Sequence, residues 1–411
     1  MIKRQLRIIG LFFIAFLLIT GMVSDALAAD DAGLNPGDAI DASKLNNLKE
    51  YLSPGVNHMV ANEGMTIPVG EAQTFEHNPK YKEYTAQYSP QVTLDQSTNY
   101  FQGYTRGLPF PSIDVNDPKA GYKIGYNVEY RLRPDELIYE YIDLVYRGKN
   151  NKIERVLSMK VDQLYWLGRA VLPDIPNPEK VRWQELLAFS DPLDVAGVAF
   201  LIKRYMDPAK IDDSWAYIPA VRRIRRMASA QRSDPLLGSD WSLEDMYCYN
   251  DKVEDQNWNF VKKQKMYIQR YATIDEGRPI KWGGTNSWCV LEQPYQLRDI
   301  YVVEGIPKNP RHPYTKRVMF IDGEWWDTPQ ADCYDRKGEL WKVLFEYTHY
   351  DPEYKMLNWS FANAVDVQNS HCTPVLYKIA INEETEKLGG VQPDKFTTTT
   401  LKKYGYGRIM K

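Results

Sequence analysis

The sequence predicts a mainly β (α+β) fold built on one large, curved antiparallel sheet. Runs of alternating apolar and polar residues recur along much of the chain, and turn-forming residues separate them. Aromatic residues make up 13% of the chain, with 29 tyrosines and 11 tryptophans, which is typical of strands that pack rings on a sheet face. The pattern lacks the strand–helix alternation of a doubly wound fold.

The first residues indicate a signal peptide. Lys3, Arg4 and Arg7 precede an apolar run of about 16 residues, and residues 26–28 supply a small-x-small cleavage pattern. A retained membrane anchor is the alternative, but a bilayer core requires roughly 20 apolar residues. We therefore expect residues 1–28 to be removed, which leaves a soluble protein in the periplasm of a Gram-negative envelope.

Charge and length limit the choice of partners and domains. The formal net charge is -3, and removal of residues 1–28, which carry a net charge of +2, leaves -5. A mildly acidic chain binds nucleic acid poorly, so we expect no nucleic-acid partner. The mature length is compatible with one elaborated antiparallel domain or with two domains.

The four cysteines suggest disulfides because the chain is expected in an oxidising compartment. Their spacings of 41, 44 and 39 residues match no compact metal motif, so we expect no metal site. Three pairings are open. Loop entropy favours Cys248 with Cys289 and Cys333 with Cys372, and buried free thiols are the alternative.

Residues 29–125 are expected to form a short helix followed by an extended wrapping segment. Asp41 would cap a helix in which Leu45, Leu48 and Leu52 share one face, and Pro54 would end it. Residues 68–118 are dense in proline, tyrosine and polar residues, which predicts a segment that wraps a surface rather than forming a core.

From residue 126 onward the pattern indicates strands. Residues 138–146 and 153–161 form a predicted hairpin around a turn at 148–151. Turn signals at 322–323 and 335–338 separate later strands, as in successive hairpins. The predicted strands are 126–132, 138–146, 153–161, 199–205, 213–218, 258–261, 265–270, 298–304, 317–322 and 340–347.

Several blocks in order resemble those of a known family. They are residues 107–111, 205–208, 213–219, 222–226, 238–240, 312–318 and 334–341. On these blocks the chain resembles the periplasmic proteins that carry the domain of unknown function 1329 (DUF1329), which are related to LolA/LolB-like outer-membrane lipoprotein-sorting carriers. The resemblance implies that residues 126–411 form an incompletely closed antiparallel β-barrel, with helices lidding or plugging an apolar hollow. It also implies a lipid or other hydrophobic ligand, an inner-membrane transporter and an outer-membrane acceptor.

An arginine block precedes an acidic turn. In a strand, Arg223 and Arg225 would face one side while Arg222 and Arg226 face the other. One interpretation is a structural network with the carboxylates of Asp234, Asp240, Glu244 and Asp245. The other gives the guanidinium groups to an anionic headgroup or to acidic residues of a partner.

Aromatic residues are candidates for the lining of the hollow, with ordinary sheet packing as the alternative for each. Adjacent Trp325 and Trp326 would point to opposite faces of a strand, so we expect at least one to be exposed or covered by the N-terminal segment. The cavity candidates are Tyr165, Trp166, Trp215, Tyr217, Trp288, Trp341 and Trp359.

Enzymatic motifs are missing from the sequence. It has no Gly-x-Ser-x-Gly elbow, His-Glu-x-x-His pair or phosphate-cradling glycine loop, so we expect no catalytic residue and no cofactor. Two function classes therefore compete, and a hydrolase that uses Ser239 with Asp240 is a less favoured third. A carrier would require an apolar cavity, whereas a structural adaptor of an envelope complex would have a barrel filled by its own side chains.

Overall fold

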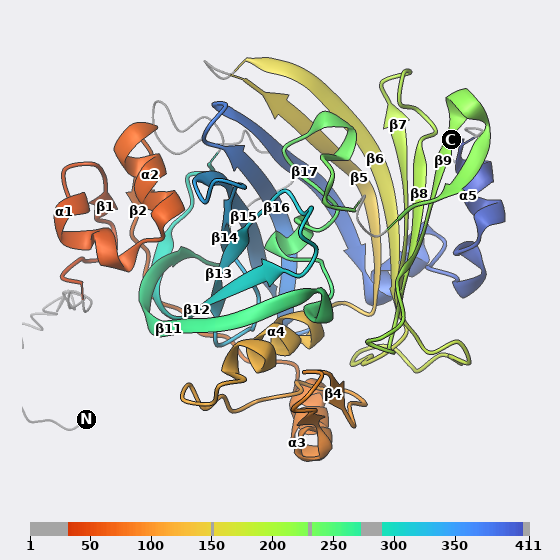
Figure 1. Cartoon of the computed structure of the whole chain (residues 1–411), viewed down its shortest axis with the longest axis horizontal. Helices are drawn as coiled ribbons and strands as arrows, with labels where there is room; N and C mark the ends of the chain where they lie inside the picture. Colours follow the sequence, from red (N-terminus) through yellow and green to blue (C-terminus); the bar gives the residue numbers. More distant parts are fainter. Residues whose placement is uncertain (1–31, 149–151, 229–231, 273–289, 406–411) are drawn as a thin grey trace, which may run out of the picture.

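The computed structural model describes residues 32–148, 152–228, 232–272 and 290–405 (Figure 1). The predicted signal peptide, Trp288, Cys289 and the turn at 149–151 lie outside these ranges. No helix within them is long and apolar enough to cross a membrane.

One sheet of 13 antiparallel strands dominates the molecule and curves around an inner face (Figure 1). Its order is β10-β9-β8-β7-β6-β5-β17-β16-β15-β14-β13-β12-β11, so two meanders meet where β17 pairs with β5. Strands β10 and β11 are its two edges, so the sheet is curved without being closed into a barrel. The strands are β5 Glu136–Arg147, β6 Ile153–Tyr165, β7 Val181–Asp191, β8 Ala199–Tyr205, β9 Asp213–Ile218, β10 Arg223–Arg226, β11 Gln256–Gln269, β12 Tyr295–Pro307, β13 Lys316–Asp322, β14 Gln330–Tyr334, β15 Leu340–Asp351, β16 Met356–Asp366 and β17 His371–Ile381.

This strand order forces one long crossing. Consecutive strands β10 and β11 lie at opposite edges of the sheet, so the chain between them must pass from one edge to the other. It does so across the inner face, where Trp241, Leu243 and Tyr249 are buried with residues from both meanders. We call residues 232–255 the crossing segment. It contains only short 3₁₀ turns, at Leu236–Gly238, Met246–Cys248 and Val253–Asp255.

The two faces of the sheet bury different apolar sets because side chains alternate along each strand. In β15, Leu344 joins the cluster on the inner face, whereas Val343 and Phe345 join a cluster on the outer face. Helices α1 and α2 cover that outer cluster. The C-terminal helix α5 covers a second outer cluster beside β7, β8 and β9 (Figure 1). The helices are α1 Leu45–Leu48, α2 Pro54–Asn62, α3 Pro79–Tyr88, α4 Ala120–Tyr130 and α5 Thr398–Gly405.

Helix α4 replaces the strand predicted at residues 126–132, so that prediction was wrong. Every residue of α4 except Lys123 is buried, and a helix that is buried all round shows no helical period in its sequence. Close packing on β11 explains its glycines: a Cβ atom added at Gly125 would lie 2.8 Å from the ring of Trp258.

The N-terminal region also departs from the prediction at its helix. Asp41 accepts the amide of Ser43 in a turn and does not cap α1, whose N-cap is Lys44. Pro54 begins α2 at its first turn instead of ending a helix, and the hydroxyl of Ser53 caps that helix. Short paired strands accompany these helices: β1 Ala39–Ile40 with β2 Ile67–Pro68, and β3 Thr93–Leu94 with β4 Phe101–Gln102.

Residues 68–118 wrap the molecule and also enter its interior, contrary to the prediction. Tyr81, Phe101 and Phe110 are buried members of the inner cluster. Phe101 stacks on Tyr126 of α4 with ring centroids 4.4 Å apart. This region thus packs beneath α4 at one open end of the curved sheet (Figure 1).

The cysteines contradict both predicted disulfide pairs. Cys248 and Cys333 are free thiols, and both are fully buried in the inner cluster. Neither the Cys248–Cys289 bond nor the Cys333–Cys372 bond is therefore formed. Loop entropy was the wrong criterion, because packing on the inner face buries these two thiols as apolar groups. Burial raises the pKa of the Cys333 thiol to about 12.

Candidate functional site

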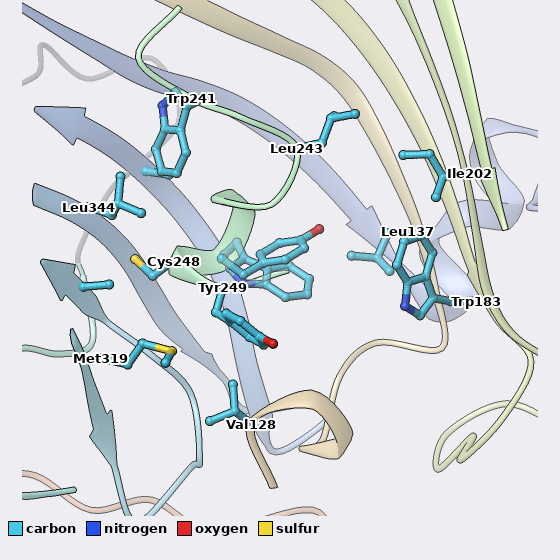
Figure 2. Packing of buried hydrophobic residues seen from close by; sticks show 14 of the residues in the cluster. Val128, Leu137, Trp183, Ile202, Trp241, Leu243, Cys248, Tyr249, Met319 and Leu344 are labelled. Atoms are coloured by element: carbon cyan, nitrogen blue, oxygen red, sulfur yellow. The ribbon is translucent and has the colours of Figure 1, made fainter. Parts of the chain in front are cut away.

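The candidate site is the hollow on the inner face of the sheet, and the crossing segment fills most of it (Figure 2). Trp241 is fully buried, and its indole nitrogen donates to the carbonyl oxygen of Thr373 at 2.7 Å. The ring of Tyr247 lies against Trp359 of β16, with centroids 4.6 Å apart. A cavity of about 50 Å³ lies between the segment and strands β5, β6, β7, β15, β16 and β17.

Tyrosine hydroxyls and two carboxyl groups supply the polarity of this remaining space. The hydroxyls of Tyr139 and Tyr247 are 3.2 Å apart, and Tyr377 donates to Glu346 at 3.1 Å. Burial raises the pKa of Glu185 to about 7 and also raises the pKa of Glu346. These carboxyl groups therefore favour the uncharged form, which suits an apolar environment.

Polar contacts anchor the crossing segment on both sides of its apolar residues. Asp245 pairs with Arg317 of β13 at 2.5 Å and accepts the hydroxyl of Tyr314 at 3.0 Å. Burial alone would raise the pKa of Asp245, but the positive charge of Arg317 helps to hold it below its usual range. Glu244 lies 3.0 Å from the ring nitrogen Nε2 of His312.

A further anchor lies nearer the start of the segment. The carboxylate of Asp240 contacts Nδ1 of His371 at 2.6 Å and accepts the hydroxyl of Thr373 at 2.7 Å. The contact with Asp240 raises the pKa of His371, because the carboxylate stabilises the protonated ring. The segment is thus attached to β17 as well as to the β12–β13 region.

The backbone of the segment is strained at three residues. Leu237, Tyr247 and Cys248 have φ angles of 50°, 58° and 57°, in the left-handed region that non-glycine residues disfavour. Each such residue costs on the order of 1 kcal/mol or more, so packing and the polar anchors must hold this conformation.

The predicted cavity residues divide between the two faces. Tyr165 and Trp359 belong to the inner cluster, and half-buried Trp341 packs against it. In contrast, Tyr217 belongs to the outer cluster beneath α5, and Trp166 and Trp215 pack against that cluster. Tyr217, Trp166 and Trp215 therefore do not line the hollow. They were misassigned because the sequence does not reveal which of the alternating side chains of a strand face inward.

Trp325 and Trp326 lie in the turn between β13 and β14 rather than in a strand. Residues of the N-terminal segment cover Trp325, whose ring stacks on His77 with centroids 3.8 Å apart, as expected for at least one of this pair. Both tryptophans border a mainly apolar pocket of about 360 Å³ between this turn and α3. We call it the side pocket; Leu108, which also lines it, belongs to the inner cluster.

The arginine block forms the edge strand β10 and the residue before it. Arg222, Arg223, Arg225 and Arg226 are all exposed, and Arg226 pairs with Asp213 of β9. The structural network proposed from the sequence is not formed, because its acidic members have other partners. Asp240 contacts His371, Glu244 contacts His312, and Asp245 pairs with Arg317.

Sequence reasoning missed the residues that fill the hollow. Trp241 follows Asp240 in the acidic turn, but no local pattern marks it as buried, and the partners of the carboxylates in that turn come from distant parts of the chain. Tyr139, Tyr247 and Glu185 carried no motif at all. Among the described residues, no group of three or more His, Cys, Asp or Glu side chains could hold a metal ion.

Comparison with known proteins places the chain in a family. Residues 39–402 match the family described as "Protein of unknown function (DUF1329)", so the chain belongs to it. An uncharacterized protein of Pseudomonas aeruginosa is 23% identical over 363 residues, which cover 81% of this chain and 76% of that protein.

A solved structure shares the fold. A putative outer membrane lipoprotein-sorting protein domain from Vibrio parahaemolyticus aligns with a TM-score of 0.50 at 21% identity, covering 70% of this chain and 100% of that domain. A DUF1329 family protein from Desulfovibrio piger gives a TM-score of 0.48 at 20% identity, with the same coverage. The Vibrio domain is therefore similar in its curved antiparallel sheet.

Proposed function

We propose, from membership of the DUF1329 family and from the apolar hollow, that this protein is a carrier that shields a lipid or another hydrophobic molecule in the cell envelope. In this proposal the cargo takes the place of the crossing segment on the inner face. A membrane transporter would load or receive the cargo, and an outer-membrane acceptor would complete the transfer.

The proposal rests on the kind of structure that fills the hollow. A solid protein core is built from regular elements, whereas here an irregular and strained segment covers the inner face of the sheet. Polar anchors hold it at Asp240, Glu244 and Asp245. Its middle part, residues 236–249, can leave while the strand ladder stays intact, because the Arg232–Asp212 pair and the contacts of Arg204 with the carbonyl oxygens of Asn250 and Asp251 keep its ends attached.

The free energy of burial favours an exchange of the crossing segment for a cargo molecule. Burial of an acyl chain contributes about 0.8 kcal/mol per CH₂ group, so ten groups contribute about 8 kcal/mol. The cargo would replace apolar contacts that Trp241, Leu243 and Tyr249 make in the unloaded state. Burial of the cargo would thus offset the apolar contacts that the segment gives up, and a partner protein could shift the balance between the two states without ATP.

The side pocket offers a starting point for loading. It is already open, is mainly apolar, and shares Leu108 with the inner cluster. A chain end could enter there before the crossing segment moves. Its volume of about 360 Å³ lies in the range of small-molecule pockets, whereas the 50 Å³ left in the hollow does not.

The filled hollow also favours a second candidate, the structural adaptor. A sheet whose inner face stays permanently packed would need no cargo and could serve only to hold an envelope complex together. The two candidates differ in one respect: a carrier requires the crossing segment to move.

A reversible tether between segment and sheet tests this difference. The backbone amide of Asp240 lies 3.1 Å from the hydroxyl of Thr373, which places the two Cα atoms within about 7 Å, so Asp240→Cys/Thr373→Cys would connect the crossing segment to β17 on oxidation. We expect the reduced variant to bind the apolar dye 1-N-phenylnaphthylamine and a fluorescent fatty acid, and the oxidised variant to lose at least tenfold in affinity. The wild type under the same oxidant is the control.

Each outcome separates the candidates. Equal binding by oxidised and reduced protein would contradict displacement of the segment. Absence of binding in every form, with a folded protein, would favour the adaptor.

A further inference from the structure

Strand β10 is an open edge of the sheet. It pairs with β9 over Arg223–Arg226 and with no other described strand, so its outer amide and carbonyl groups face away from the sheet. It is short, and its residues are exposed apart from half-buried Ile224. An edge of this kind is a template on which another extended chain can add.

The side chains of β10 present a specific pattern. Arg223 and Arg225 lie on one face together with Met227, which packs against the inner cluster. Ile224 and Arg226 lie on the opposite face, where Ile224 packs against the outer cluster and Arg226 pairs with Asp213. Along the strand, two guanidinium groups on one face therefore alternate with one apolar side chain on the other face.

These two guanidinium groups are unmatched within the described structure. No described carboxylate lies within 4.0 Å of Arg223 or Arg225, and both side chains are exposed. Arginine binds carboxylates through two parallel hydrogen bonds, which makes it a strong recognition group for acidic residues. Exposed Val221 and Ile218 border the same edge and add apolar surface.

The opposite edge shows how this sheet protects an edge that is not used. Strand β11 carries Lys262, Lys263 and Lys265 and is bulged between Phe260 and Lys262. Helix α4 packs on it, and Gln264 donates to the carbonyl oxygen of Glu50 at 2.9 Å. Lysines, a bulge and a cover are the usual defences against unwanted pairing. Strand β10 is also short and charged, but it has neither a bulge nor a described cover.

We infer that β10 is a docking edge for an extended acidic segment of another protein, which adds to the sheet as a further strand. Its carboxylates stand opposite Arg223 and Arg225, and an apolar residue stands opposite Ile224. Directly opposed residues on paired strands share a face and lie about 5 Å apart, so the partner carries an acidic–apolar–acidic pattern at consecutive positions. This inference does not depend on the cargo proposal.

A peptide with that pattern tests the inference. The probe is a fluorescein-labelled eight-residue peptide with glutamates on both sides of a central valine and neutral β-forming residues elsewhere. We expect binding by the full-length mature protein, and loss of at least tenfold in affinity for Arg223→Glu/Arg225→Glu. The matched control, Lys262→Glu/Lys263→Glu on β11, reverses two charges on the other edge and should leave affinity unchanged.

Backbone pairing is tested separately from charge. An N-methylated version of the peptide keeps its carboxylates but cannot complete the strand ladder, and we expect it to bind at least tenfold more weakly. Equal binding of the N-methylated peptide, or of a version with its glutamates placed together, would overturn strand addition. Binding of the protein to phosphatidylglycerol vesicles but not to the peptide, lost in the β10 double variant, would assign the edge to a lipid headgroup instead.

Discussion

Several arginines in the interior of this protein are buried in ion pairs, whereas two arginines at the edge of its sheet are exposed and have no described carboxylate partner. In the interior, Arg204 pairs with Glu129 at 3.0 Å and with Asp212 at 2.9 Å, and it is 2% exposed. At the edge, Arg223 and Arg225 are in water without a described carboxylate partner. A charge removed from water must be compensated, whereas a charge left in water is available for a partner.

The interior pairs also connect distant parts of the chain. Glu129 of α4 meets Arg182 of β7 and Arg204 of β8, and Asp212 joins Arg204 to Arg232 of the crossing segment. The helix, the sheet and the start of the crossing segment are therefore attached by one network. Exposed arginines add nothing comparable to the fold.

The largest expected effect comes from breaking the interior network. Arg204→Met leaves Glu129 and Asp212 buried with fewer compensating charges, and we expect the free energy of unfolding to fall by about 3–5 kcal/mol. Urea denaturation measures this. Lys203→Met is the neighbouring control: its partner Glu179 is 62% exposed, so the loss should stay below about 1 kcal/mol. Similar losses for both variants would remove the distinction between interior and edge.

Glu185 differs from the interior arginines because it is buried without an ion pair among the described residues. Its pKa is about 7 in the folded protein against 4.5 for the free side chain, with burial as the main cause. The folded protein thus holds this proton more tightly than the unfolded chain. Its contribution to stability is present below about pH 4.5 and is lost as the pH rises through 7, on the order of 3 kcal/mol in all.

Glu185→Gln removes this titration. We expect the variant to lose less stability between pH 4.5 and 8 than the wild type, as measured by urea denaturation at several pH values. Parallel curves for the two proteins would show that Glu185 does not carry the pH dependence.

A smaller effect is expected from the apolar part of the crossing segment. Trp241→Ala vacates space on the inner face, and we expect affinity for 1-N-phenylnaphthylamine to rise several-fold. Trp166→Ala is the matched control, because Trp166 packs on the outer face. An equal rise in both variants would indicate general loosening of the fold rather than enlargement of the hollow.

The smallest effect on stability is expected at the edge. Arg223→Ser/Arg225→Ser should change the free energy of unfolding by no more than about 0.5 kcal/mol, because both side chains are exposed and without a described ion pair. Urea denaturation checks this value. A loss of 2 kcal/mol or more would show that these arginines support the fold.

The strand pattern could be predicted where short runs of apolar and aromatic residues are bounded by polar or turn-forming residues. Residues 199–205 and 213–218 match β8 and β9 residue for residue, and the 138–146/153–161 hairpin is confirmed as β5 paired with β6. Strands β7 and β16 were missed because polar residues such as Arg182 and Asn363 are buried in them along with the apolar ones, so polarity does not mark an exposed face. For the same reason α4 was taken for a strand.

The site was harder to predict than the strands. The arginine block was recognised, but the partners of the carboxylates that follow it depend on long-range contacts such as that between Asp245 and Arg317, 72 residues apart. The crossing segment follows from strand order, which the sequence does not encode in any local pattern. Trp215 was wrongly assigned to the hollow because the sequence indicates its strand but not which side chains of that strand face inward.

Native mass spectrometry with lipid extraction tests the central claim most directly. The protein would be purified without detergent from the cells that produce it naturally, and bound molecules would be identified after release. The carrier account predicts a defined lipid or other hydrophobic molecule at a fixed stoichiometry. A protein that is folded yet reproducibly empty would contradict the account and favour the adaptor.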